Sequence, residues 1–232
     1  MSRLGTPHLH LRSVTSTNDR ARSLATGGAP HGTLVTATHQ TAGRGRQGRS
    51  WVAPAGRALL ASVVLRDPGD LLPLAAAIAV ARTVGADALI KWPNDVLIEG
   101  RKVAGILVEA RPQDGWAVLG IGVNVAIAID ELPGALHERA GTLGGAPGDV
   151  ERVLGTLLGE LEAALALAPA AVLDAYRARD ALCGRTITWE HGHGRATGVD
   201  DVGRLLVAHD DGRCSALNAG EVSLGGPRRT AH

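Results

Sequence analysis

The stretch that most limits how this chain can fold is residues 40–51, Q-T-A-G-R-G-R-Q-G-R-S-W. Three glycines alternate in it with three arginines, and burying unpaired guanidinium groups costs several kcal/mol or more each. The stretch must therefore be an exposed loop, and the segments around it must supply the core. Glycines let a backbone approach a ligand, and arginines suit carboxylate and phosphate. The loop is either a ligand-binding loop or a solvated Arg/Gly linker that touches nucleic acid.

The composition is that of a folded protein. The 232 residues are 45% hydrophobic with a net charge of +1, which suits one large domain, or a large and a small one. The small net charge argues against broad electrostatic capture of nucleic acid or membrane, and the longest apolar stretch, 71–81, is too short to span a bilayer. The N-terminus lacks a secretory signal pattern. We expect Cys183 and Cys214 to be reduced thiols in a cytoplasmic protein.

Lysine is rare and is confined to one segment. The chain has 22 arginines and only two lysines, Lys91 and Lys102. A lysine offers a compact, mobile ammonium where an arginine offers a rigid fork. We therefore expect these two positions to need an ammonium for function, against the alternative that they fell there by chance.

Strand and helix signals alternate up to residue 182. Apolar and β-branched runs predict strands, and capped 3.6-residue periods predict helices. The strands are expected at 8–14, 33–39, 58–65, 88–91, 96–99, 102–110 and 116–129. The helices are expected at 17–26, at 70–84 with Asp70 as the cap, from 149 onward and at 169–182. This order predicts an α/β (α+β) fold with a mixed sheet flanked by helices, and we expect a ligand at the strand ends.

The texture of the chain changes after Gly184. Short strands, the last at 221–224, are separated by turn signals about ten residues apart, which predicts a small antiparallel barrel or sandwich. Its core is thin, so it should dock on the larger unit. We expect two domains, 1–182 and 183–232.

Three segments carry the chemistry: a hydroxyl-bearing turn at 15–18, the Gly/Arg loop at 40–51, and the strand end at Lys91. The loop is not a P-loop, because G-x-x-x-x-G-K-[ST] is absent, nor a Rossmann turn, because no capped helix follows it. The positive groups predict an anionic ligand. No Ser-His-Asp or Cys-His set is present at a motif position, so a reaction that works by positioning and charge neutralisation fits best.

Five motifs, in order, resemble those of the biotin–protein ligases, specifically the short form without an N-terminal DNA-binding domain. They are S-T-N at 16–18, Q-T-A-G-R-G-R-Q-G-R-S-W at 40–51, K-W-P-N-D-V at 91–96, K-V-A-G-I-L-V-E at 102–109 and G-I-G-V-N-V at 120–125. With the C-terminal barrel the resemblance covers nearly the whole chain. It implies a biotin/lipoate ligase-type fold, with a catalytic domain at 1–182 and an SH3-like domain at 183–232.

The resemblance implies a two-step reaction. The biotin carboxylate attacks the α-phosphate of ATP, bound with Mg²⁺, and gives biotinyl-5′-AMP and pyrophosphate. A lysine of a biotin carboxyl carrier protein domain, part of a biotin-dependent carboxylase, then takes the biotinyl group and releases AMP. No DNA or membrane partner is expected, and the chain is expected to be a monomer or a homodimer.

The resemblance also assigns roles to residues. Those implied to be catalytic are Lys91, Arg44 and Arg46. Those implied to bind biotin are Ser16, Thr17, Asn18, Gln40, Gly43, Arg44, Gly45, Arg46, Lys91 and Gly105. Those implied to bind the nucleotide are Arg46, Trp51, Lys91, Asn94, Lys102 and Asn124. Trp51 is expected near adenine, Asn124 could equally be a satisfied core residue, and no protein side chain is assigned to a metal.

Two alternatives remain open at this point. A lipoate or octanoate–protein ligase or transferase has the same fold, and an RNA-binding module could use the Gly/Arg loop, although the scarcity of aromatic residues argues against it. Gln47 stands where some family members have a further arginine, so the loop has one charge fewer. Because of its glycines and like charges, we expect residues 42–50 to be mobile without ligand.

Overall fold

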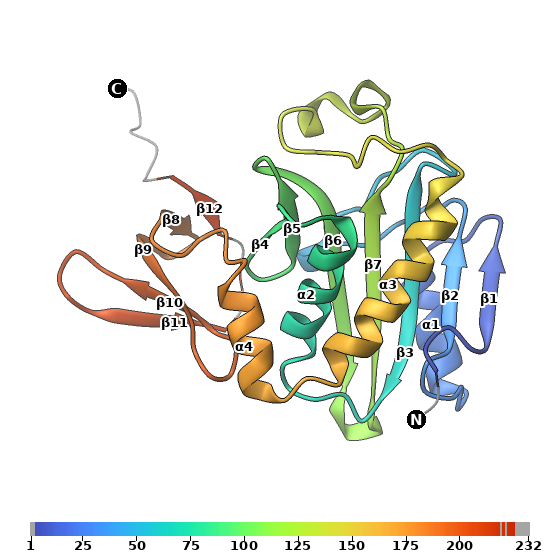
Figure 1. Cartoon of the computed structure of the whole chain (residues 1–232), viewed down its shortest axis with the longest axis horizontal. Coiled ribbons are helices and arrows are strands. Elements are labelled where there is room, and N and C mark those ends of the chain that lie inside the picture. The colour runs from blue at the N-terminus through green and yellow to red at the C-terminus, as the bar shows by residue number, and fades with distance from the viewer. Residues whose placement is uncertain (1–2, 219, 221, 226–232) are drawn as a thin grey trace.

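The computed structural model describes residues 3–218, 220 and 222–225 (Figure 1). Within these residues the larger unit contains seven strands and four α-helices, and the smaller unit contains five strands. The strands of the larger unit are β1 (His8–Leu11), β2 (Leu34–Ala37), β3 (Ala58–Arg66), β4 (Leu89–Lys91), β5 (Asp95–Ile98), β6 (Arg101–Arg111) and β7 (Trp116–Asn124). Its helices are α1 (Thr17–Thr26), α2 (Leu72–Val84), α3 (Asp149–Leu165) and α4 (Pro169–Arg177).

The seven strands form one mixed sheet in the order β1-β2-β3-β7-β6-β5-β4. Only the β1–β2 pair is parallel, and the other pairs are antiparallel. The long central strands β3, β7 and β6 pair antiparallel with one another, and this places Gly105 of β6 opposite Gly122 of β7. The predicted mixed sheet flanked by helices is confirmed.

Side-chain alternation along the strands gives the sheet two different faces. On one face Leu59, Ala61 and Val63 of β3 join the main core beneath α2 and α3. Helix α2 is apolar on nearly all sides and lies buried between the sheet and α3. On the other face Val64 and Val118 pack with α1 in a second cluster.

Helix α1 covers only part of its face of the sheet. Continuing along the same face from Val118, the next positions of β7 are Gly120 and Gly122, and the facing strand β6 offers Gly105. These positions carry no side chain that could fill the space above them. The uncovered, glycine-lined half of this face therefore becomes the floor of a cavity.

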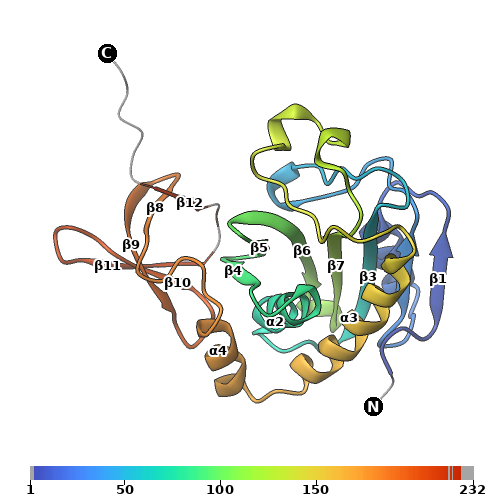
Figure 2. The ribbon, with the colours of Figure 1, turned by 45° about the horizontal axis from the view of Figure 1, so that its top comes forward.

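The smaller unit has strands β8 (Thr186–Trp189), β9 (Gly192–Val199), β10 (Leu205–Ala208), β11 (Cys214–Leu217) and β12 (Ser223–Leu224) in an antiparallel sheet ordered β11-β10-β9-β8-β12. It packs on the larger unit, beside α4 and α2 (Figure 2). Trp92 Nε1 of the larger unit donates to the Gly203 carbonyl of the smaller one at 3.1 Å, and α4 contacts β9. The expected docking of a small SH3-like unit on the larger one is confirmed.

Several expected boundaries shift. The strand expected at 116–129 ends at Asn124, because the chain then turns to pair with the loop at 141–145. The helix expected to begin at Asp70 begins at Leu72, and the helix expected to reach residue 182 ends at Arg177. Of the last expected strand, Glu221 lies outside the described residues. Among those described, no helix is long and apolar enough to cross a membrane.

Candidate functional site

A cavity of about 580 Å³ lies over the glycine-lined half of the sheet. Arg44, Arg46 and Lys91 come from separate segments, and all three line it. Of the other residues singled out in the sequence, it is also lined by Ser16, Thr17, Asn18, Gln40, Gly45, Trp51, Asn94, Lys102, Gly105 and Asn124. The motifs therefore converge on one cavity. Its floor is a sheet face, and its rim is reached by the segments that follow β1 and β2 and by Lys91 at the end of β4, as expected for strand ends.

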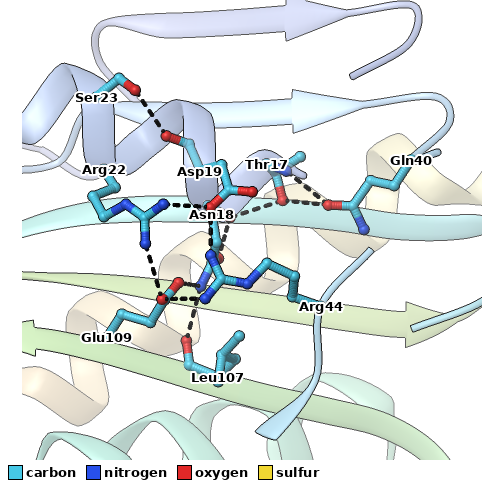
Figure 3. A network of polar contacts seen from close by, with 10 residues as sticks. Thr17, Asn18, Asp19, Arg22, Ser23, Gln40, Arg44, Leu107 and Glu109 are labelled. Atoms are coloured by element: carbon cyan, nitrogen blue, oxygen red, sulfur yellow. Dashed lines mark hydrogen bonds and ion pairs between the residues drawn. The ribbon is translucent and has the colours of Figure 1, made fainter. Parts of the chain in front are cut away.

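The turn that begins α1 is buried and fully engaged in polar contacts (Figure 3). Gln40 Oε1 accepts from the backbone N–H of Thr17 at 2.7 Å and lies 3.0 Å from its hydroxyl. Ser62 Oγ donates to Asn18 Oδ1 at 2.6 Å and lies 2.8 Å from Thr17 Oγ1. Ser16 occupies the N-cap position without a capping hydrogen bond from its side chain. Ser62 was not expected at the site from the sequence, since no motif contains it.

The glycine at position 120 makes room for Asn18. A Cβ there would lie 2.1 Å from Asn18 Oδ1 and under 3 Å from the other two atoms of that carboxamide. A Cβ on Gly43 would likewise lie 2.4 Å from the Trp51 carbonyl and 2.9 Å from Gln40 Nε2. Both glycines therefore serve close packing at the site. The contact with ligand implied for Gly43 stays a prediction.

The Gly/Arg loop has a defined fold in this structure. Trp51 N–H donates to the Gly43 carbonyl at 2.9 Å, and Gly45 N–H donates to the Arg49 carbonyl at 2.7 Å. Between them runs a short 3₁₀ turn, Arg46–Gly48, in which Gln47 adopts a positive φ of 55°. Whether residues 42–50 become mobile without ligand stays a prediction.

Arg44 is held by two carboxylates. It pairs with Asp19 of α1, and its Nη2 lies 2.8 Å from Glu109 Oε1 on β6. Partial burial alone would lower the pKa of Arg44, but the two carboxylates outweigh it and the pKa is raised. Neither acid was singled out from the sequence. The alternation of Gly105, Leu107 and Glu109 in β6 is the signal that places Glu109 on the cavity face.

Lys102 stands over the floor of the cavity. Its Nζ lies 5.6 Å from the centre of the Trp51 ring, within cation–π range, and 2.5 Å from Asp95 Oδ1. Lys91 lies opposite Asp95 in the neighbouring strand, and Asp95 is the ion-pair partner of Lys102. Both lysines therefore lie at one rim of the cavity. The expectation that both positions need an ammonium for function stays a prediction.

The Trp51 indole covers the paired glycines of the floor. A Cβ on Gly122 would lie 2.5 Å from the indole, and one on Gly105 would lie 2.9 Å from it. The buried indole N–H finds no hydrogen-bond partner within the described residues. A buried donor left unpaired is costly, so this atom is suited to a ligand acceptor.

Two asparagines fix the walls of the cavity. Asn94 Nδ2 donates to the Ile106 carbonyl at 3.0 Å, and its Oδ1 accepts from Arg46 Nη1 at 3.3 Å. Asn124 Nδ2 donates to the Gly141 carbonyl at 2.8 Å, so its amide fastens the 139–141 segment beside Lys102. This supports the reading of Asn124 as a satisfied buried residue. Its contact with a nucleotide stays a prediction.

One end of the cavity is apolar. Beside Trp51 it is lined by Leu60, Leu132, Leu136 and Ala140, which belong to a separate hydrophobic cluster. Lys102, whose Nζ lies over the Trp51 ring, borders this apolar part, and the other cations and the polar turn line the rest of the cavity. The cavity thus offers an apolar slot for a flat ring next to a basic region for anionic groups. In the described part of the chain no group of three or more His, Cys, Asp or Glu side chains is placed to hold a metal ion.

Comparison with known sequences agrees with this geometry. The Biotin/lipoate A/B protein ligase family matches residues 10–125, and the Biotin protein ligase C terminal domain matches residues 183–225. The Biotin–[acetyl-CoA-carboxylase] ligase of Paracoccus denitrificans is 38% identical, covering 93% of this chain and all of that protein. The Bifunctional ligase/repressor BirA of Bacillus spizizenii is 40% identical over 59% of this chain, and the match spans 46%, about half, of that protein.

A solved structure with the same architecture is a biotin protein ligase from Aquifex aeolicus in complex with biotin and ATP. It is 27% identical to this chain, with a TM-score of 0.80, and the alignment covers 96% of this chain and 100% of that one.

Proposed function

This chain belongs to the biotin/lipoate A/B protein ligase family, and on that premise we propose that it is an ATP-dependent biotin–protein ligase. It activates biotin as biotinyl-5′-AMP and transfers the biotinyl group to a lysine of a carrier domain. The observation that carries the proposal is the convergence of Arg46, Lys91 and Lys102 on one cavity that also holds the polar turn at Ser16.

In the first step, two anions must meet. A biotin carboxylate oxygen attacks the α-phosphorus of ATP, the bond from that phosphorus to the bridging oxygen breaks, and pyrophosphate leaves. Repulsion between two unit charges about 4 Å apart at an effective dielectric constant of about 20 is about 4 kcal/mol. Lys91, Lys102 and Arg46 offset this repulsion, and they stabilise the charge that builds up on the phosphorus oxygens. No covalent enzyme intermediate is needed.

The two ends of the cavity fit the two substrates. The buried turn at Thr17 and Asn18, with Gln40, presents fixed donors and acceptors that suit the ureido ring of biotin. The apolar slot beside Trp51 suits adenine. Mg²⁺ comes with ATP as part of the substrate, and a metal held mainly by phosphate oxygens fits a cavity whose described lining residues include just two carboxylates, Asp95 and Glu138.

In the second step, the unprotonated lysine amine of the carrier attacks the carbonyl carbon of the mixed anhydride. The bond from that carbon to the phosphate oxygen breaks, AMP leaves, and the amine loses its proton to solvent. The anhydride must be kept from water until the carrier arrives, and the Gly/Arg loop with Trp51 forms the cover over it. The carrier is proposed to be a biotin carboxyl carrier domain.

We divide the chain into a catalytic region at 1–182 and an SH3-like region at 183–232. The match of the C-terminal family from residue 183 supports this boundary. Ser223 and Leu224 of β12 reach the lining of the cavity, so the small region is placed to contact a bound substrate or the arriving carrier.

The direct test incubates the purified chain with biotin, MgATP and a carrier domain, and detects biotin on the carrier by blotting. A parallel reaction with a carrier whose target lysine is changed to arginine controls for chemical labelling. Labelling of the carrier with lipoate and not with biotin would refute biotin as the substrate. The absence of any ATP-dependent labelling would refute the activity. The identity of the relatives favours biotin over lipoate, and favours an enzyme over an RNA-binding module.

A further inference from the structure

A continuous chain of polar contacts begins and ends on the Gly/Arg loop (Figure 3). Gln40, where the loop starts, contacts Thr17, and Thr17 contacts Ser62. Ser62 donates to Asn18 Oδ1 at 2.6 Å, and Asn18 Nδ2 donates to Glu109 Oε2 at 2.8 Å. The remaining oxygen of Glu109 accepts from Arg44, which lies on the loop again.

Glu109 contacts both the polar turn and the arginines beside it. One oxygen, Oε2, fixes the carboxamide of Asn18, while the other, Oε1, lies 2.8 Å from Arg44 Nη2 and 3.5 Å from Arg22 Nη1. Its side chain is only 20% exposed. It is therefore placed between the polar turn and the loop and touches both.

The charges of this cluster cancel. Asp19 and Glu109 contribute two negative charges, and Arg22 and Arg44 contribute two positive ones. A guanidinium shared between two carboxylates adds little net positive potential at a neighbouring phosphate. Arg44 is thus better suited to fastening the loop than to binding ATP.

We propose that Arg44, clamped by Asp19 and Glu109, is the latch that holds the Gly/Arg loop closed over the adenylate, and that Glu109 couples this latch to the turn that recognises biotin. Glu109, Asp19 and Arg44 are positioning residues, and the proposal rests on the function proposed above. For Arg44, the assignment replaces the catalytic and biotin-binding roles that the family resemblance implies.

The coupling works through the geometry of Asn18. A ligand ring that orders Asn18 also orders the Glu109 carboxylate, and the ordered carboxylate is a better acceptor for Arg44. Arg44 is on the loop, so a filled biotin subsite favours the closed loop. By reciprocity, a closed loop strengthens the hold on biotin by the same factor.

The test separates release of the adenylate from its formation. Asp19→Asn removes one arm of the latch without touching Asn18, Glu109→Gln alters both the latch and Asn18, and Arg44→Ala removes the latch. Biotinyl-5′-AMP is formed on each protein from biotin and labelled ATP, and its loss is followed by rapid filtration. Pyrophosphate release in a single turnover reports the chemistry. Asp174→Asn, an exposed and ion-paired acid on α4, is the matched control.

A partly exposed ion pair changes an equilibrium by about fivefold. We expect Asp19→Asn to speed adenylate release about fivefold, with its single-turnover pyrophosphate release within about twofold of the parent, and Arg44→Ala to speed adenylate release about twentyfold. Glu109→Gln should also raise the KM for biotin. Adding Asp19→Asn to Arg44→Ala should change nothing further, because the partner is already gone. Trypsin should cut the loop faster in the latch variants, in the presence of biotin.

Two results would overturn the latch. One is adenylate release from Asp19→Asn at the parent rate. The other is a loss of about a hundredfold in pyrophosphate release for Arg44→Ala with normal adenylate retention, which is the outcome for a direct phosphate ligand. If Glu109→Gln does not fold, the more exposed Asp19 still carries the test. A parent protein that makes no biotinyl-5′-AMP would refute the proposed function, whereas normal synthesis with unchanged release would refute only the latch.

Discussion

Lys102 gives the sharpest test of charge neutralisation, because its ammonium screens a carboxylate. Its Nζ lies 2.5 Å from Asp95 Oδ1. Replacing Lys102 with alanine therefore removes one positive charge from the cavity and leaves one negative charge exposed to the incoming anions. A double variant that removes both the ammonium and the Asp95 charge loses the attraction of the ammonium for the anions but leaves no negative charge exposed. The comparison of the single and the double variant separates these two effects.

The magnitudes follow from Coulomb's law. A unit charge about 5 Å from the reacting phosphate, at an effective dielectric constant of about 20, contributes about 3 kcal/mol. The Asp95 carboxylate, about 2 Å farther away, opposes the reaction by about 2 kcal/mol. Because the repulsion from Asp95 is present in the parent too, Lys102→Ala loses only the contribution of the ammonium and should slow adenylation by roughly 150-fold, and the double variant with Asp95→Asn should recover about thirtyfold of that loss.

The assay is single-turnover pyrophosphate release at saturating biotin and ATP. Asp95→Asn alone keeps the ammonium and serves as the control. It should be no slower than the parent, and up to about thirtyfold faster, since it removes the repulsion from the carboxylate and keeps the ammonium. A double variant no faster than Lys102→Ala would refute the unscreened-carboxylate argument, and a Lys102→Ala enzyme with near-normal rate would refute the role of this ammonium altogether.

Three further outcomes are expected. Lys91→Ala should slow adenylation by on the order of a hundredfold or more, measured as pyrophosphate release, and a near-normal rate would contradict its role. Trp51→Ala should raise the KM for ATP more than that for biotin in steady-state assays, because the apolar slot loses its wall; the reverse order would move Trp51 away from adenine. Gly120→Ala should raise the Kd for biotin by at least about tenfold, since the new methyl displaces the Asn18 carboxamide, and unchanged binding by calorimetry would exclude that role for Asn18.

The parts of the site that could be predicted from the sequence are those with an unusual residue composition or a recognisable motif. The Gly/Arg loop had to be exposed because of its charge, and the scarcity of lysine pointed to Lys91 and Lys102. The segments expected at strand ends, the turn after β1, the loop after β2 and Lys91 at the end of β4, do line the cavity, but its floor over the face of β6 and β7 was not expected. The antiparallel order of β3, β7 and β6 depends on long-range pairing, which local patterns do not reveal.

The positioning residues could not be found in the same way. Ser62 lies in an apolar strand and Glu109 lies at the end of a motif, and neither type is unusual there. Their positions at the site depend on strand register. Gly120 of β7 lies opposite Ser62 of β3 on one side and opposite Leu107 of β6 on the other. The expected cap at Asp70 was wrong as well, since Leu71 holds the N-cap position of α2.

The hydrogen bond from Trp92 to the Gly203 carbonyl has a consequence for any shortened form of the protein. Trp92 is the immediate neighbour of Lys91, and the strand before it is braced by Asp180. Cutting the chain after residue 182 would strip the indole of its acceptor and uncover apolar surface next to the ammonium. If such a truncated protein were inactive, the cause would be a displaced Lys91, because the truncated chain still contains every charged residue of the cavity.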